Sequence, residues 1–309
     1  MIKKSQLLLV TLALLSISAS SVWAGAWTMP AGKLYTRVAY SEYDSQRFFN
    51  ENGTSHRYAP NEDYKAELRG KVPRNFDYDE QTWSVYAEYG LLDKLTLIGS
   101  LDYKETEWTY QGDPGTASLI DKTAKSSGLG DLNFGLRYRL LATQSGALSL
   151  QAMYKTGECY DEEDENFGTD IQRGDGQDDF EMRLQYGQSL YPLIPGYFNV
   201  EAGYRWRTQQ YADEFTYLLE AGVDITKALY LRTKLDGFAN LGNGDSGPTG
   251  SYTEIDSNPY EVDLGKLEVT VGYKIIPQLS LEASYFNELY GASTTKGDTW
   301  SLALAATLF

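Results

Sequence analysis

Residues 180–186 read FEMRLQY, and apolar side chains occupy every second position of this stretch. Charged or amide side chains fill the positions between them. A period of two places all the apolar side chains on one face of a β-strand, whereas the helical period of 3.6 residues would scatter them. The same alternation recurs at 132–140 and at 198–207. These stretches therefore predict strands that have one apolar and one polar face.

About twelve stretches of this kind follow one another along the chain. They lie at residues 33–44, 81–90, 95–107, 130–141, 147–157, 178–189, 197–207, 214–224, 228–239, 262–274, 279–289 and 299–309. The connections between them alternate between short ones, such as 225–227, and longer ones, such as 45–80, 158–177 and 290–298. Short turns at one rim and long loops at the other are typical of outer-membrane barrels. We therefore predict an all-β fold, a transmembrane antiparallel up-and-down β-barrel of about 12 strands, with short periplasmic turns, long extracellular loops and both termini in the periplasm.

The placement of the tyrosines supports the same fold. The chain has 25 tyrosines, and aromatic residues make up 14% of it. Nine tyrosines fall on the apolar phase of their strands: Tyr89, Tyr103, Tyr138, Tyr154, Tyr186, Tyr204, Tyr217, Tyr273 and Tyr285. Tyrosine gathers at the two interfaces between a membrane and water. The alternative is that these rings form the core of a soluble β-sandwich, but a sandwich has no reason to offer so many similar apolar faces.

The N-terminal residues 1–24 predict a secretory signal peptide. Two lysines precede an apolar run at 7–17, and Val22-Trp23-Ala24 supplies tolerated residues for a cleavage site. The run is too short for a transmembrane helix, which needs about 20 apolar residues. We expect residues 25–309 to form one barrel domain in the outer membrane of a Gram-negative bacterium.

The charge and the rare residue types exclude several classes of function. The chain has 27 Lys and Arg against 43 Asp and Glu, a net charge of -16, and nucleic acid requires a basic face instead. A single cysteine excludes a disulfide framework and a thiolate zinc site. With a single histidine as well, we expect no metal centre and no cofactor.

Barrel enzymes of the phospholipase or omptin type need a histidine fixed near a strand rim. The histidine of this chain, His56, falls in the long polar connection 45–80, where we predict a surface residue without a strand beneath it. Cys159, in another loop, is predicted to be an unpaired bystander. We therefore predict that the protein is not an enzyme and has no catalytic residue.

The polar phase of the strands carries many charged side chains, which a barrel directs inward. Five arginines are the candidate residues for solute selectivity: Arg137, Arg139, Arg183, Arg205 and Arg207. Guanidinium groups on neighbouring strands could guide anionic solutes through a pore. Acidic residues share the same phase, so the alternative is a narrow interior filled with ion pairs that hold the barrel rigid.

Two further features concern partners at the cell surface and during assembly. Loop 158–177 is rich in carboxylates, which predicts a solvated acidic loop or, as the alternative, a calcium bridge to lipopolysaccharide. The chain ends at Phe309, which resembles the terminal aromatic residue that the barrel-assembly machinery reads. Phe309 nevertheless falls on the phase opposite to the apolar residues of the last strand.

Three stretches resemble a known family: GLGDLNFGLRYRL at 128–140, GDGQDDFEMRLQYG at 174–187 and GYFNVEAGYRWR at 196–207. They are similar to bacterial outer-membrane barrels described as phenol-degradation (MetA-pathway) proteins and to the related XagA-like proteins. The Gly and Asp residues let a chain turn tightly from a long loop into a barrel wall, so they specify architecture more than substrate. The resemblance implies transport or export across the outer membrane, of aromatic compounds by the first label or in association with polysaccharide by the second.

Together these features predict an outer-membrane channel or transporter that passes small solutes, aromatic or anionic ones included, by diffusion. The alternative is a non-transporting structural barrel whose acidic loops meet the surface polysaccharide. The expected partners are outer-membrane lipid and lipopolysaccharide, the barrel-assembly machinery and a small-molecule solute, without nucleic acid. The solute and the oligomeric state are left open.

Overall fold

The computed structural model describes residues 25–57, 74–112, 120–156, 173–174, 176–245, 258 and 260–308. None of these residues forms a helix that is long and apolar enough to cross a membrane. The predicted signal peptide, Cys159 and Phe309 lie outside the described residues, as does most of the acidic loop 158–177.

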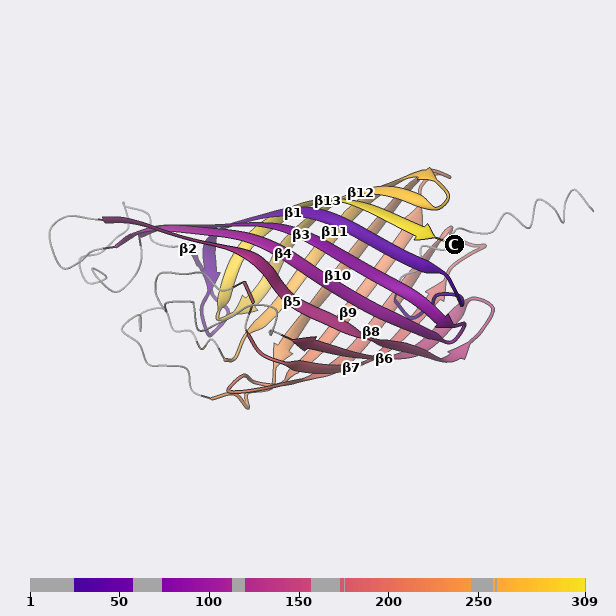
Figure 1. Cartoon of the computed structure of the whole chain (residues 1–309), viewed down its shortest axis with the longest axis horizontal. Helices are drawn as coiled ribbons and strands as arrows, with labels where there is room; N and C mark the ends of the chain where they lie inside the picture. Colours follow the sequence, from indigo (N-terminus) through magenta and orange to yellow (C-terminus); the bar gives the residue numbers. More distant parts are fainter. Residues whose placement is uncertain are drawn as a thin grey trace, which may run out of the picture.

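Within the described residues, twelve strands close into one antiparallel barrel (Figure 1). They are β1 (Leu34–Phe49), β3 (Arg74–Leu92), β4 (Leu95–Gly112), β5 (Ile120–Ala142), β6 (Gly146–Thr156), β7 (Asp179–Ser189), β8 (Gly196–Arg207), β9 (Glu214–Asp224), β10 (Leu229–Asn240), β11 (Asp263–Ile276), β12 (Leu279–Ala292) and β13 (Thr294–Leu308). Each strand pairs with the next, and β13 pairs with β1, so Leu34 lies opposite Leu308 at the closing seam. The predicted twelve-stranded barrel is confirmed.

The barrel is apolar outside and polar inside, which reverses the arrangement of a soluble protein. Leu184 on β7 is 48% exposed, whereas its neighbour Gln185 is 1% exposed because it points into the lumen. The exposed outer face continues around the barrel through residues such as Leu136, Val271 and Leu304. Such an exterior matches lipid rather than water. The chain therefore has the fold and the outer face of a bacterial outer-membrane barrel.

Aromatic side chains and the polar residues beyond them mark the limit of the lipid-facing band. The rings of Tyr40 and Trp83 pack together on the outer face, with centroids 5.0 Å apart. One step further along the same phase, Glu42, Gln81 and Glu105 lie opposite one another on β1, β3 and β4, and all three are exposed. The change from aromatic to polar side chains is the expected boundary between lipid and water.

The wall of the barrel is uneven in height, and this corrects several predicted boundaries. Strands β3, β4 and β5 have 19, 18 and 23 residues, whereas β6, β7 and β9 have 11 each. In Figure 1 the long strands project beyond the rest of the wall, at the end opposite the short turns. Alternation predicted a shorter β3, at 81–90, because the outward-facing residues beyond the lipid band, such as Asp77 and Asp79, are polar.

Two of the predicted connections were wrong. The expected long loop 290–298 is a tight turn at Ser293, whose φ of 55° lies in the left-handed region, and β13 begins at Thr294. The expected connection 45–80 contains the end of β1 and a short strand, β2 (Ser55–Arg57), which pairs with the end of β1. His56 therefore lies on a strand, opposite Phe48, and not in a strand-free loop.

A charge placed on the outer band tests its contact with lipid. We expect Leu184→Arg to destabilise the barrel by about 2–4 kcal/mol, because the residue lies midway along the apolar face of β7. The measurement is reversible unfolding in urea with the barrel in lipid vesicles. Leu193→Arg is the matched control, since Leu193 is 92% exposed in the turn after β7 and should tolerate the charge within about 0.5 kcal/mol. Equal losses from the two variants would contradict the assigned lipid band.

Candidate functional site

The barrel lumen holds a cavity of about 580 Å³ on the side of strands β6 to β9. Charged and amide side chains of the inward phase supply most of its lining. The lining residues are Ser100, Asn133, Gln151, Met153, Lys155, Gly174, Asp179, Glu181, Arg183, Arg205, Arg207, Tyr211, Glu214, Phe238 and Val262. A cavity of this size fits a small organic solute.

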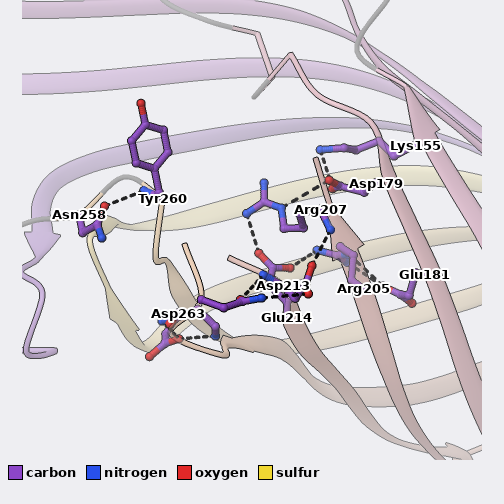
Figure 2. Close-up of polar contacts among 12 residues, drawn as sticks. Lys155, Asp179, Glu181, Arg205, Arg207, Asp213, Glu214, Asn258, Tyr260 and Asp263 are labelled. Atoms are coloured by element: carbon purple, nitrogen blue, oxygen red, sulfur yellow. Dashed lines mark hydrogen bonds and ion pairs between the residues drawn. The ribbon is translucent and has the colours of Figure 1, made fainter. Parts of the chain in front are cut away.

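Cross-strand register explains the ion pairs at this cavity. Asp179 on β7 lies opposite Arg207 on β8, and Glu181 lies opposite Arg205 two residues further along. The Nε atom of Arg207 is 3.4 Å from Asp179, and Nη2 of Arg205 is 2.9 Å from Glu181. Glu214 on β9 accepts from both arginines, at 2.6 Å from Arg205 and 2.8 Å from Arg207 (Figure 2). Three strands are therefore joined by one network of alternating charge.

The network extends to both sides, and its positive and negative charges nearly cancel. Lys155 on β6 lies 2.8 Å from Asp179, and Arg183 donates to Glu181 at 2.6 Å and to Glu201 at 3.0 Å. Four cations, Lys155, Arg183, Arg205 and Arg207, thus face five anions, Asp131, Asp179, Glu181, Glu201 and Glu214. The cavity lining offers many hydrogen-bonding groups but no large field of either sign.

The two other predicted arginines lie nearer the short-turn end. Arg137 is 4% exposed and forms a fork with Glu88, in which Nη1 and Nη2 donate to the two carboxylate oxygens at 2.9 and 3.1 Å. Arg139 is half-buried, opposite Ser149 in the register of β5 and β6. The structure therefore brings Arg183, Arg205 and Arg207 together at the cavity and places Arg137 and Arg139 apart from it. Four of the five form ion pairs, as the rigid-interior alternative describes, while their part in selectivity stays a prediction.

Apolar side chains at the cavity were not anticipated. Met153 and Phe238 occupy the polar phase of β6 and β10 and so point into the lumen. The guanidinium carbon of Arg205 lies 5.7 Å from the centre of the Phe238 ring, and that of Arg207 lies 4.5 Å from the centre of the Tyr211 ring. An aromatic residue on the polar phase of a strand was the signal that could have identified Phe238.

The loop between β8 and β9 forms one edge of the cavity. Tyr211 packs edge-on against Tyr260, with ring centroids 5.2 Å apart, and the backbone N–H of Ala212 donates to the carbonyl of Tyr260 at 2.9 Å. Burial alone would raise the pKa of Asp213, but hydrogen bonds from the backbone of Arg207 and from Tyr204 hold that pKa below its usual range. The loop is thereby fixed to the barrel rim by bonds that an ionised Asp213 accepts.

A second charged cluster occupies the opposite wall, where β10, β11, β12 and β1 meet. Glu282, 2% exposed, accepts from Arg37 at 2.9 Å and from Tyr230 at 2.6 Å. Arg232 lies 3.4 Å from Glu282 and 3.3 Å from Glu268. This part of the lumen is filled by side chains that bond to one another. Among the described residues no group of three or more His, Cys, Asp or Glu could hold a metal ion.

Solved structures share this fold. An outer membrane channel from Pseudomonas putida F1 superposes with a TM-score of 0.62 and 12% identity, covering 92% of this chain and 98% of that one. The NanC porin superposes with a TM-score of 0.50 and 7% identity, covering 88% of this chain and 100% of that one. No protein-family model matches the sequence, and no curated protein matches it either. These similarities show the fold that this chain shares with outer-membrane channels.

Proposed function

We propose that this barrel is an outer-membrane channel that passes small solutes by diffusion, aromatic or anionic ones included. The observation that carries the proposal is the lumen cavity, in which guanidinium groups lie beside exposed apolar surface. Solute sites of this kind combine apolar walls with a few placed polar groups. The shared fold with channel-forming barrels supports the proposal.

The paired charges suggest how a solute is recognised. A solute carboxylate can exchange with a protein carboxylate on Arg183 or Arg205, because both are acceptors for the same planar fork of donors. Each exchange replaces one charged contact with another, so binding is weak and reversible, as passage through a channel requires. The side chains of Met153 and Phe238 would meanwhile cover the apolar part of the solute.

Conductance of single barrels in a planar bilayer tests this function. We expect a steady ionic current that aromatic carboxylates interrupt more strongly than uncharged sugars of similar size. Absence of current from folded barrels, both of the full chain and of a chain that lacks residues 25–32, would refute the channel. It would favour the second candidate, a structural barrel, for which the filled cluster around Glu282 is the specific observation.

Selectivity provides a test at the level of residues. We expect Arg183→Ala, Arg205→Ala or Arg207→Ala to lower the anion-to-cation permeability ratio severalfold, because each removes one positive charge from the network and leaves its carboxylates in excess. The measurement is the reversal potential across a salt gradient. Lys125→Ala is the control, since Lys125 pairs with Glu107 at a largely exposed site outside the cavity. An unchanged ratio in all three arginine variants would remove these residues from the selectivity site.

The remaining assignments belong to the same proposal. Removal of residues 1–24 as a signal peptide would deliver the chain to the periplasm, where the barrel-assembly machinery would insert it beside lipopolysaccharide. Arg137 and Arg139 would act on solutes that have passed the cavity. Membership of the phenol-degradation or XagA-like family, and the absence of enzymatic activity, are proposed together with the channel function.

A further inference from the structure

Residues 25–33 precede β1, and residues 25–30 lie within the short-turn end of the barrel, whereas residues 31–33 are exposed. Ala26 and Met29 are 0% exposed and Thr28 is 1% exposed, although the segment belongs to no strand. In Figure 1 the indigo trace before β1 turns back at the short-turn end instead of leaving the barrel there. This burial requires partners for the backbone of the segment, because unpaired polar groups are costly to bury.

Side chains of the lumen wall supply those partners at the start of the segment. The backbone N–H of Ala26 donates to Oδ1 of Asn199 on β8 at 3.2 Å, and Oγ of Ser149 on β6 donates to the carbonyl of Ala26. The carbonyl of Trp27 accepts from Nη1 of Arg137 on β5 at 3.1 Å. The side chains of the wall thus pair with the backbone N–H and C=O groups of the segment, as the backbone of a neighbouring strand does in a sheet.

The contacts continue along the segment to β4 and β3. The N–H of Met29 donates to Oγ1 of Thr96 at 2.8 Å, and the hydroxyl of Thr28 donates to the carbonyl of Asp93 at 2.7 Å. The N–H of Gly32 donates to the carbonyl of Gly90 at 2.8 Å. The segment thus follows the inner wall from β8 to β3, past half of the barrel strands.

Two wall glycines make room for the segment. A Cβ on Gly187 would lie 2.5 Å from the ring of Trp27, whose ring also packs edge-on against Tyr197 with centroids 6.0 Å apart. A Cβ on Gly90 would lie 2.0 Å from the carbonyl oxygen of Pro30. The wall therefore provides both hydrogen-bond partners and space for this particular stretch of chain.

We propose that residues 25–32 are a displaceable plug, which closes the short-turn end of the lumen when docked and opens it when it leaves. This inference rests on the proposed channel function. The plug is joined to the barrel wall by hydrogen bonds, and after the proposed removal of residues 1–24 its remaining covalent link is at Lys33, where β1 follows, so it can swing out without disturbing a strand pair. The lumen cavity would then connect with the periplasm.

Conductance of a plugless barrel tests the proposal. The full chain and a chain lacking residues 25–32 are exported with the same leader, purified from outer membranes and placed in a planar bilayer. We expect the deletion to raise the mean conductance at least severalfold. A synthetic peptide of residues 25–33 should restore the low conductance when it is added at the short-turn side. A peptide with the same residues in reversed order is the matched control and should leave the conductance unchanged.

The outcomes separate this inference from the channel function. Equal conductance of the two chains would refute the plug and leave the channel standing. Silence from both folded chains would refute the channel and the plug together. If the deletion prevents folding, the full-length variant Gly90→Ala replaces it, because the added Cβ would lie 2.0 Å from the carbonyl oxygen of Pro30 and would displace the docked segment. Its conductance should exceed that of the unchanged chain severalfold, and an equal conductance would overturn the proposal.

Discussion

Replacing Arg137 with Ala is expected to destabilise the barrel by about 3–5 kcal/mol, which is the typical loss when one partner of a buried ion pair is removed. Arg137 and Glu88 are both about 4% exposed, so the substitution leaves a carboxylate buried without its counter-ion. It also removes the guanidinium donors that bond to Oε1 of Gln151 and to the carbonyl of Trp27. The measurement is the free energy of unfolding in urea, with the barrel in lipid vesicles.

Two further variants show whether the loss comes from the unpaired charge. Lys125→Ala breaks a pair of similar length, 2.7 Å, but its partners are 67% and 39% exposed, and we expect a loss of at most about 1 kcal/mol. The double variant Arg137→Met with Glu88→Leu should recover most of the stability, because it leaves neither charge buried alone. A loss from Arg137→Ala as small as that from Lys125→Ala would show that the lumen is solvated at this level.

The second large effect is expected from Gly90→Ala, which should raise the conductance of the channel to nearly that of the barrel without residues 25–32. The added Cβ would meet backbone atoms of Pro30 and Met29 at 2.0–2.7 Å, and a backbone cannot move aside as a flexible side chain can. Gly90 has no positive φ, so alanine suits the strand itself. The expected result is therefore a folded barrel with a displaced plug.

Gly99→Ala is the matched control for this experiment. Gly99 lies on the neighbouring strand β4, where the nearest atom to an added Cβ is the carbonyl oxygen of Asn133 at 3.8 Å. The conductance of Gly99→Ala should equal that of the unchanged barrel. If Gly90→Ala also leaves the conductance unchanged while the barrel keeps its thermal stability, the contact between Pro30 and β3 does not hold the channel closed.

The strands were predictable from the sequence because the membrane imposes a strict alternation where it touches the wall. Leu184 and Gln185 differ in exposure as their positions in the pattern predict. The pattern fails beyond the lipid level, where the outward phase of β3 continues with Asp77 and Asp79 instead of apolar residues. Likewise, no local signal identified the turn at Ser293, because the strand pairs on both sides determine it.

The candidate site was predictable in its residue types but not in its contacts. Periodicity alone places Arg183, Arg205 and Arg207 in the lumen. Their partners depend on how β7, β8 and β9 are aligned, which one sequence does not specify. The plug was missed for a different reason. Residues 25–33 have no periodicity, and Ala26 and Met29 are buried only because Asn199 and Thr96, distant in sequence, bind their backbone.

The network of Asp179, Glu181, Arg205 and Arg207 has a consequence for the way the barrel assembles. A slip of one residue between β7 and β8 would turn apolar side chains inward and polar ones toward the lipid, so contact with lipid is enough to disfavour it. A slip of two residues leaves apolar side chains facing outward and polar ones facing inward, so contact with lipid does not disfavour it. It would, however, set Glu181 opposite Arg207 or Asp179 opposite Arg205 and leave a charge at the end of the row without its counter-charge. The lumen charges thus favour the native alignment of β7 and β8 over an alignment shifted by two residues. The almost uniform outer surface could not distinguish these two alignments.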